Sequence, residues 1–269
     1  MEKDSTVKIA MASPRMDGEW DTAKALGTAE AFARQAASLG AAAVCFPEAF
    51  LTGYVPSRVR ELAVVSTGEE TRKLSALAET TGIDILCGFM ERITGGYRVT
   101  HGIFRPDGGC DFYSKSHLGE TEKAVFLPGN SIGVYPLSCG LRAGFQLCVE
   151  LHVPEMTQSL SRQGADIIFC PHSVPGSPGK RKSVWEKLVS ARGYDSRCYI
   201  ACCNDRRSSH EGGIAAADPE GSLLLSAFGK EDCLEVFEAD PDLLGRLRSS
   251  SQSMSDRYYP SMARKELYI

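Results

Sequence analysis

The sequence predicts an α/β fold in which strands and helices alternate along the chain. Apolar stretches of strand length recur from residue 7 to residue 237, and segments with helical periodicity separate them. Two segments, residues 101–109 and 214–221, also look alike, because each is a strand that turns through a Pro- and Gly-containing tip and returns as another strand. This likeness indicates two similar halves that face each other.

The first elements are a strand at residues 7–12 and a helix that Asp21 or Thr22 can cap and that ends at Gly40. One face of this helix is apolar and is expected to pack on the core: Leu26, Ala29, Phe32, Ala33, Ala36 and Leu39.

The remaining elements follow the same alternation. A second helix is expected at residues 69–80 and an apolar strand at residues 83–91. A third helix follows Pro154, and the pattern Ser183-x-x-Glu186 fits the capping box of a fourth helix.

Composition indicates one large globular core. The chain has 269 residues, of which 43% are hydrophobic and 24% charged. The alternative is a chain of two small domains, but no linker, repeat or low-complexity tract interrupts the strand signals. We therefore expect a single domain over residues 1–269.

Charge and hydropathy patterns argue against a nucleic-acid or membrane partner. The net charge is −4 and the pI is about 5.8, and the densest basic run, residues 180–182, is short. Residues 1–4, Met-Glu-Lys-Asp, are mostly charged and lack the apolar core of a signal peptide, and no apolar run has the length of a membrane span. We expect a cytoplasmic protein.

Cys148 lies where an apolar strand, residues 144–147, approaches a helix that starts at Pro154 and Glu155. At such a junction, free backbone N–H groups and the helix dipole can lower a thiol pKa and bind a developing oxyanion. A lone cysteine is more often structural, so a nucleophile needs partners.

Two candidate partners occupy similar positions. Glu48 ends an apolar strand and precedes apolar and aromatic residues, so its carboxylate must be paired or its pKa raised. Lys115 ends an alternating strand at residues 111–114, where a surface lysine is the simpler interpretation of that residue alone.

With these three residues in chain order at three strand ends, the chain resembles the nitrilase superfamily of carbon–nitrogen hydrolases. The matching motifs cover nearly the whole chain, and the ordered set is specific although each motif is weak: Phe46-Pro47-Glu48 with Gly53-Tyr54, Tyr113-Ser114-Lys115-Ser116-His117-Leu118, Glu122 to Gly129, Leu147-Cys148-Val149-Glu150 with Pro154-Glu155, Ala191-Arg192, and Asp218-Pro219-Glu220-Gly221.

The resemblance implies a four-layer α-β-β-α sandwich with the site at the carboxyl ends of the strands. It also implies a Glu48–Lys115–Cys148 triad that hydrolyses a linear amide or N-carbamoyl compound through a thioester. Cys148 attacks, Glu48 shuttles the proton, and Lys115 holds the oxyanion together with the backbone N–H of Val149. No cofactor or metal is expected.

Further residues are expected to support the site. Glu122 aligns with a second acidic residue that positions substrate and orients the lysine in related enzymes; its alternative is a solvated helix start, with Glu120 as nearest rival. Plausible pocket residues, each of which could instead satisfy local backbone groups, are Tyr54, Asn130, His172 and Ser173.

Two departures from the family pattern affect substrate identity. Val149 and Glu150 stand where many members have an aromatic residue and Asp, so the role of Glu150 is open. Residues 191–196 read Ala-Arg-Gly-Tyr-Asp-Ser, where the family pattern is Ala-Arg-Ala-x-Glu-Asn.

The ten cysteines do not suggest a metal or disulfide framework. None has CxxC spacing, and no histidine cluster accompanies them. Most lie in apolar strands and are expected to be small core residues: Cys45, Cys87, Cys170, Cys198, Cys202 and Cys203.

Three functions remain open at this point. The first is the hydrolase of linear amides or N-carbamoyl compounds, and the second is a nitrilase that acts on a C≡N bond through a thioimidate. The third is a catalytically idle binding protein with the same fold.

Relatives of this family commonly pair through helices beside the site, so a homodimer or a higher even-numbered homo-oligomer is expected. The helix after Pro154, with Met156 and Leu160, and the helix with Trp185, Leu188 and Val189 could supply the apolar contact surface. Packing of these side chains on their own sheet is the alternative.

Overall fold

The computed structural model describes residues 6–175, 178–207, 212–229 and 231–249. Its strands are β1 (Val7–Ser13), β2 (Ala43–Cys45), β3 (Asp84–Ile93), β4 (Gly96–Phe104), β5 (Cys110–Ser114), β6 (Tyr135–Pro136), β7 (Arg142–Phe145), β8 (Ile167–His172), β9 (Tyr199–Asn204), β10 (Gly212–Ala217), β11 (Leu223–Gly229) and β12 (Cys233–Ala239). Its helices are α1 (Thr22–Ser38), α2 (Val59–Leu62), α3 (Glu69–Thr81), α4 (Pro154–Arg162), α5 (Pro178–Ser196) and α6 (Pro241–Ser249), with 3₁₀ turns η1 (Pro56–Arg58) and η2 (Cys148–His152).

The strands form two six-stranded sheets with the same pairing pattern. One has the order β12-β1-β2-β3-β4-β5 and the other the order β6-β7-β8-β9-β10-β11. In each, the first pair is antiparallel, the next two are parallel and the last two are antiparallel. The two look-alike segments are the β4–β5 and β10–β11 hairpins, which confirms the prediction of two similar halves.

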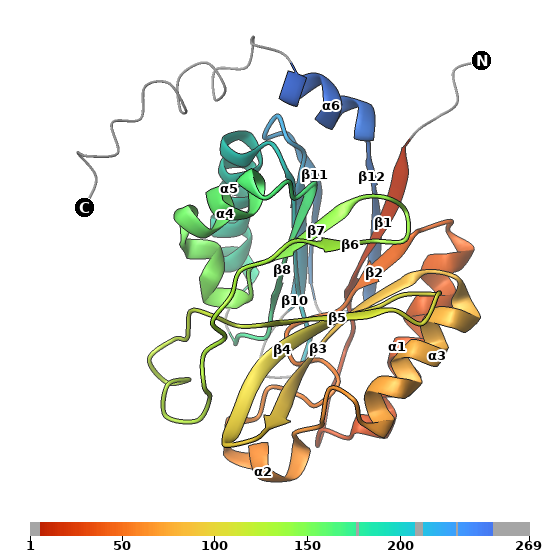
Figure 1. Ribbon diagram of the computed structural model, residues 1–269, viewed down its shortest axis with the longest axis vertical. Coiled ribbons are helices and arrows are strands. Elements are labelled where there is room, and N and C mark those ends of the chain that lie inside the picture. Colours follow the sequence, from red (N-terminus) through yellow and green to blue (C-terminus); the bar gives the residue numbers. More distant parts are fainter. Residues whose placement is uncertain (1–5, 176–177, 208–211, 230, 250–269) are drawn as a thin grey trace.

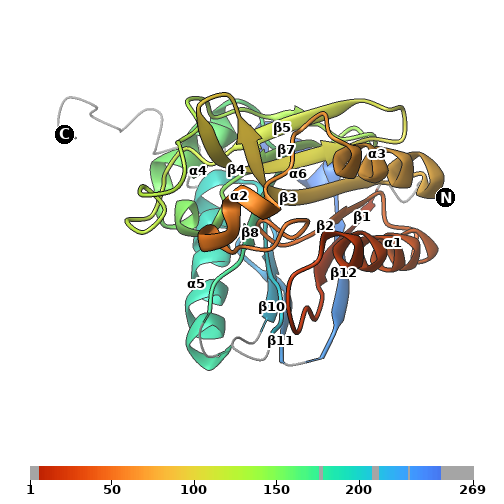
Figure 2. The ribbon, with the colours of Figure 1, turned by 90° about the horizontal axis from the view of Figure 1, so that it is seen from below.

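Helices cover the outer faces of both sheets. Figures 1 and 2 show α1 and α3 on one side of the molecule and α4 and α5 on the other. Strand β1 illustrates the layering, because its alternate residues point to opposite faces: Ile9 and Met11 belong to the core shared with the second sheet, whereas Ala10 and Ala12 pack with the helices of the first. The predicted four-layer α-β-β-α sandwich is confirmed.

Helix boundaries follow the predicted signals with two exceptions. The Asp21 side chain caps α1 by accepting from the Ala23 N–H at 2.9 Å. Leu39 was expected on the buried face of α1 but is the exposed C-cap residue. The predicted start at Ser183 is also wrong, because α5 begins at Pro178 and the Ser183 hydroxyl bonds to the Lys180 carbonyl within the helix.

The apolar residues proposed for a dimer contact do not form a surface. Met156 and Leu160 of α4, and Trp185 and Val189 of α5, are buried in the large core that also contains Ile9 and Met11, and the fifth residue, Leu188, is half-buried against that core. The exposed large apolar residues of α5 are instead Val184 and Tyr194. Homo-oligomerisation therefore stays a prediction, without the contact residues first assigned to it.

The core cysteines lie as predicted. The six that occupy apolar strands or their edges are fully buried, and all ten cysteines, each within the described residues, are free thiols. Residues 1–4 lie outside the described ranges. Within those ranges, no helix combines the length and apolar character that crossing a membrane requires.

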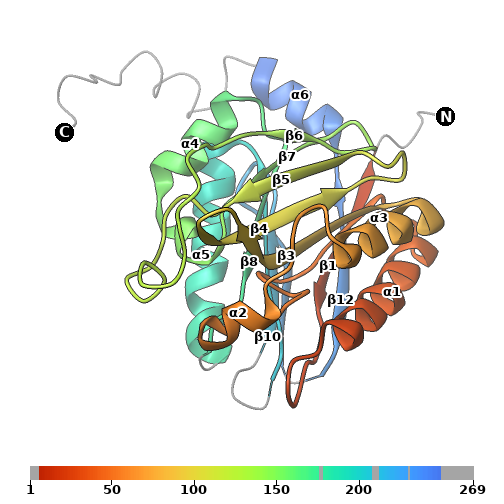
Figure 3. The same ribbon diagram turned by 60° about the horizontal axis from the view of Figure 1, so that its bottom comes forward.

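The site is assembled at one edge of the sandwich. Strands β1, β2 and β3 run parallel, and two successive antiparallel pairings give β5 the same direction as β3. Lys115 follows β5 and Glu48 follows β2, so both leave the carboxyl edge of the first sheet. Cys148 follows β7 at the corresponding edge of the second sheet. Figure 3 shows β3, β4 and β5 side by side in front of the second sheet.

Candidate active site

The centre of the site is the Lys115 ammonium between two buried carboxylates. Lys115 Nζ donates to Glu48 Oε1 at 2.8 Å and to Glu122 Oε1 at 2.7 Å. The Lys115 and Glu48 side chains are each 1% exposed. Burial alone would lower the Lys115 pKa, but the negative charges of Glu48 and Glu122 and the hydrogen bond to Glu122 outweigh it, so the pKa is raised and the ammonium stays protonated.

The Glu48 carboxyl is held by the loop after β8. The Glu48 N–H donates to the His172 carbonyl at 3.2 Å, and the Ser173 N–H donates to Glu48 Oε2 at 3.2 Å. Burial raises the pKa of Glu48 to about 6, against the pull of the Lys115 ammonium. A carboxylate with this pKa can accept a proton near neutral pH.

A tight backbone fit holds Lys115 in place. Its N–H donates to the Val99 carbonyl and its own carbonyl accepts from the Gly129 N–H at 2.7 Å. A Cβ on Gly129 would lie 2.1 Å from the Ser114 carbonyl oxygen. The glycine of the Pro128-Gly129 motif is therefore required for close backbone approach.

Cys148 is the first residue of the 3₁₀ turn η2, directly after the strand β7 and two linking residues. Its φ of 53° lies in the left-handed region. This conformation is unfavourable in free energy for any residue that has a Cβ. This conformation turns the backbone sharply at Cys148, and we call this turn the elbow. A strained residue at this point is consistent with a functional constraint.

The expected lowering of the thiol pKa is wrong. Burial raises the pKa of Cys148, and the negative charge of Glu48 adds to the rise, while Lys115 and a hydrogen bond from the Val149 N–H oppose it. The helix that starts at Pro154 lies beyond η2, so Cys148 is not at its N-terminus. The resting sulfur is a thiol, and it needs a base.

Glu122 lies where a residue that orients the lysine should lie. Besides Lys115, its Oε1 accepts from the Tyr54 hydroxyl at 2.8 Å, and its Oε2 accepts from the Gly119 N–H at 2.6 Å. Gly53 has φ of 69°, and a Cβ there would lie 2.5 Å from the Trp20 ring. Only glycine fits this turn, which precedes Tyr54. Glu120, the alternative to Glu122 for this role, is exposed and pairs with Lys123.

Of the remaining predicted pocket residues, three lie beside Glu48 or Cys148 and one does not. His172 and Ser173 contact Glu48 through their backbones, as described above, and the backbone N–H of Val149 acts to lower the pKa of the Cys148 thiol. Asn130 is exposed, and among the described residues no hydrogen bond joins it to the triad residues. Its predicted place in the pocket therefore has no structural support.

Sequence reasoning missed two residues at the end of β9 that hold the Ser173 loop. Asn204 accepts from the Val174 N–H at 3.0 Å and donates to its carbonyl at 3.1 Å, and the Ser173 hydroxyl donates to Asp205 Oδ1 at 3.1 Å. The sequence carries a signal for Asp205, because this carboxylate follows an apolar strand just as Glu48 does. Both residues are buried.

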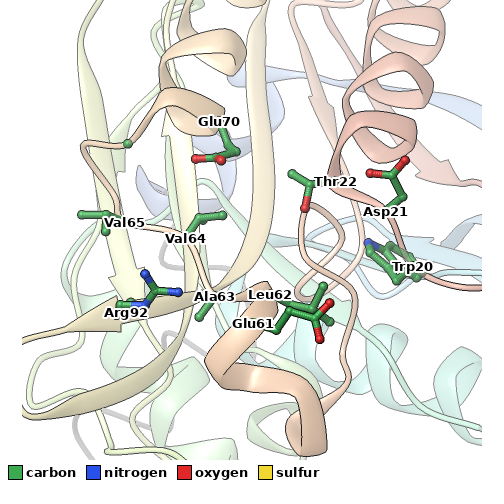
Figure 4. Close-up of a pocket in the computed structure, with 11 residues that line it drawn as sticks. Trp20, Asp21, Thr22, Glu61, Leu62, Ala63, Val64, Val65, Glu70 and Arg92 are labelled. Carbon is green, nitrogen blue, oxygen red and sulfur yellow. The ribbon is translucent and has the colours of Figure 1, made fainter.

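A separate crevice of about 510 Å³ opens between the start of α1, the end of α2 and β3 (Figure 4). Trp20, Glu61, Glu70 and Arg92 are among its lining residues, and none of the triad residues is. The Trp20 ring lines the crevice and also lies against Gly53. The crevice is therefore distinct from the Cys148 site.

Comparisons with known proteins agree with this geometry. The carbon–nitrogen hydrolase family model matches residues 8–247. An omega-amidase of Pongo abelii is 28% identical over 251 residues, which are 86% of this chain and 90% of that protein. An (R)-stereoselective amidase of a Pseudomonas species is 26% identical over 218 residues, 79% of this chain and 78% of that protein.

Among solved structures, a mutant amidase from Nesterenkonia sp. AN1 in complex with acrylamide superposes with a TM-score of 0.82 at 22% identity, covering 99% of this chain and 97% of that one. This likeness shows the shared fold. The family match extends from β1 into α6 and so includes every element that carries the triad residues. The chain belongs to the carbon–nitrogen hydrolase family, whose members are enzymes that hydrolyse carbon–nitrogen bonds other than peptide bonds.

Proposed function

We propose that this enzyme hydrolyses a small linear amide or N-carbamoyl compound and releases ammonia, with Cys148 as nucleophile. The observation that carries the proposal is the buried Glu48–Lys115–Glu122 cluster, whose charges all act on the Cys148 thiol. The amidase activities named for two relatives support the amide class.

The protonation states suit attack by a thiol that loses its proton during the reaction. With its pKa at about 6, Glu48 is mostly ionised at neutral pH, whereas the pKa of Cys148 is raised and the thiol keeps its proton. Glu48 takes the thiol proton as the sulfur bonds to the carbonyl carbon. The carbonyl π electrons move onto oxygen and form the oxyanion of a tetrahedral intermediate.

Two donors are available for that oxyanion. Two of the three Lys115 N–H bonds are committed to Glu48 and Glu122, which leaves the third for the substrate oxygen. The N–H of Val149, the residue directly after Cys148, is the second donor. One such donor is typically worth about 3 kcal/mol of transition-state stabilisation.

The intermediate collapses with cleavage of the carbon–nitrogen bond. Glu48 returns its proton to the nitrogen, ammonia leaves, and a thioester remains on Cys148. Glu48 then removes a proton from water as the water oxygen attacks the thioester. The second collapse expels the sulfur, which recovers the proton from Glu48, and the carboxylic acid is released. For an N-carbamoyl substrate, the released carbamic acid gives amine and CO₂.

An ammonia-release screen over linear amides, N-carbamoyl compounds and nitriles tests the proposal. Cys148→Ala is the matched control, because it removes only the sulfur. We expect ammonia from at least one amide or carbamoyl compound and none from the variant. Release from nitriles alone would replace the proposal with the nitrilase function. Saturable ligand binding without any turnover would identify a binding protein.

A further inference from the structure

Glu150 is a buried carboxylate whose two oxygens accept hydrogen bonds from two separate segments. It is 0% exposed. Its Oε1 accepts from the Tyr113 hydroxyl at 2.7 Å, the Ser116 N–H at 2.8 Å, the Ser116 hydroxyl at 2.9 Å and the His117 N–H at 2.9 Å. Its Oε2 accepts from the Leu147 N–H at 2.7 Å.

The positions of these donors in the chain give the carboxylate its significance. Ser116 and His117 are the two residues directly after Lys115, and Leu147 is the residue directly before Cys148. The two segments come from different sheets, since Lys115 follows β5 and Cys148 follows β7. One side chain therefore links the backbone that carries the ammonium to the backbone that carries the thiol.

The elbow at Cys148 needs such a link. Its left-handed φ of 53° persists only where surrounding contacts determine it. Gln146 supplies further contacts, donating to the carbonyls of Glu150 at 2.8 Å and Val153 at 3.1 Å and accepting from the Thr157 hydroxyl. These bonds fix η2 to α4, but within this set only Glu150 reaches across to the Lys115 segment.

We propose that Glu150 is a positioning residue that sets the placement of the Cys148 thiol relative to the Lys115 ammonium. The role rests on the proposed function of the triad, and Glu150 acts through Leu147, Ser116 and His117 without touching substrate. A displacement of about 1 Å between reacting groups can cost roughly a hundredfold in rate. The carboxylate therefore influences kcat although it is no part of the triad.

Glu150→Gln is the most specific variant, because it keeps the size and shape of the side chain. An amide has one acceptor oxygen and one NH₂ group, so if its oxygen serves the Ser116 and His117 N–H groups, its NH₂ faces the Leu147 N–H. Two donors then oppose each other next to Cys148. Glu150→Asp keeps both oxygens but is shorter by one methylene, about 1.5 Å, and cannot span both segments.

The matched control is Asp84→Asn. Asp84 is also a fully buried carboxylate that accepts from a serine N–H and hydroxyl, those of Ser138, at 2.7 and 2.6 Å. It begins β3 and thus lies at the opposite end of that strand from the catalytic edge. Its loss should lower the melting temperature without changing kcat.

Steady-state kinetics, thermal melts and iodoacetamide labelling, read at the Cys148 peptide by mass spectrometry, test the role. For folded Glu150→Gln we expect kcat to fall at least tenfold with KM changed less than threefold, and Cys148 alkylation to slow at least threefold. Asp84→Asn should match wild type in both. A folded Glu150→Gln enzyme with wild-type kcat and wild-type alkylation would overturn the proposal.

Two provisions keep the result decisive. If Glu150→Gln does not fold, Tyr113→Phe removes a single donor to Glu150 Oε1, and it should lower kcat severalfold; unchanged kcat and alkylation would then overturn the role. If wild type releases no ammonia from any compound, the proposed function fails separately. The alkylation rates still report whether Glu150 places the thiol.

Discussion

Lys115 and Glu48 form an ion pair at 2.8 Å between side chains that are 67 positions apart in the chain and each 1% exposed. A buried ion pair of this kind is weak evidence for stability, since desolvation offsets much of the attraction. In the proposed mechanism its value is chemical, because it keeps a base and a cation in fixed geometry beside the Cys148 thiol.

Removal of the nucleophile should abolish turnover. Cys148→Ala and Cys148→Ser should show no measurable ammonia release while keeping the wild-type fold, because neither can form the thioester. Intact-protein mass spectrometry with a slow substrate should show an acyl adduct on wild type alone. Cys110→Ser, at an exposed cysteine, is the control and should keep full activity. Turnover by Cys148→Ala would refute the assignment.

Lys115 and Glu48 should affect kcat more than KM. Lys115→Ala should lose at least about a hundredfold in kcat, since its ammonium stabilises charge that develops in the transition state. Glu48→Gln should be nearly inactive, because an amide cannot accept and return the proton. Circular dichroism shows whether the two variants are folded, and steady-state kinetics on the folded proteins then test both expectations. A Lys115→Ala effect confined to KM would contradict the oxyanion role.

The hydroxyl of Tyr54 should contribute through Glu122. Tyr54→Phe removes the 2.8 Å bond to Glu122 Oε1 and should lower kcat/KM by about tenfold, the cost of one hydrogen bond to a charged group. Tyr135→Phe is the control, since its hydroxyl only approaches the Phe112 carbonyl at 3.4 Å. Equal activities of the two variants would exclude a contribution from the Tyr54 hydroxyl.

The pH profile of kcat/KM should have an acid limb near pH 6. Below the pKa of Glu48, about 6, the carboxyl is protonated and cannot accept the thiol proton, so activity falls. The charge of Glu122 contributes to this raised pKa. Residual activity of Glu122→Gln should therefore show the limb at lower pH; a limb that does not move would contradict this electrostatic coupling.

Two buried histidines should make the fold acid-sensitive. Burial lowers the pKa of His101 and of His172 to about 3, so both are neutral in the folded chain, whereas the unfolded chain binds protons below about pH 6.5. Each histidine therefore contributes stability above pH 6.5 that is lost as pH falls toward 3, by up to about 1.4 kcal/mol per pH unit.

Glu48 acts in the opposite direction between its unfolded and folded pKa values, 4.5 and about 6, so a comparison of variants is the proper test. Urea unfolding from pH 7 to pH 5 should show a shallower loss of stability for His101→Gln than for wild type. Equal slopes would show that His101 is already protonated in the folded protein.

The sequence by itself determined the α/β class, the paired halves and the identity of the triad candidates, because these depend on local patterns. Strand periodicity, the capping Asp21 and the reactive side chains after β2, β5 and β7 are all properties of short segments. The burial of Leu39 and a helix start at Ser183 were predicted wrongly: Leu39 is the exposed C-cap residue of α1, and α5 already begins at Pro178.

Only the tertiary structure decided the protonation states and the supporting contacts. The pKa of Cys148 is raised because burial and the Glu48 charge, both products of packing between distant segments, outweigh the local backbone donor. Asp205, Asn204 and Glu150 act on residues tens of positions away, and no sequence pattern specifies such partners. Reactivity at this site depends on distances and desolvation, and these exist only once the two sheets have packed together.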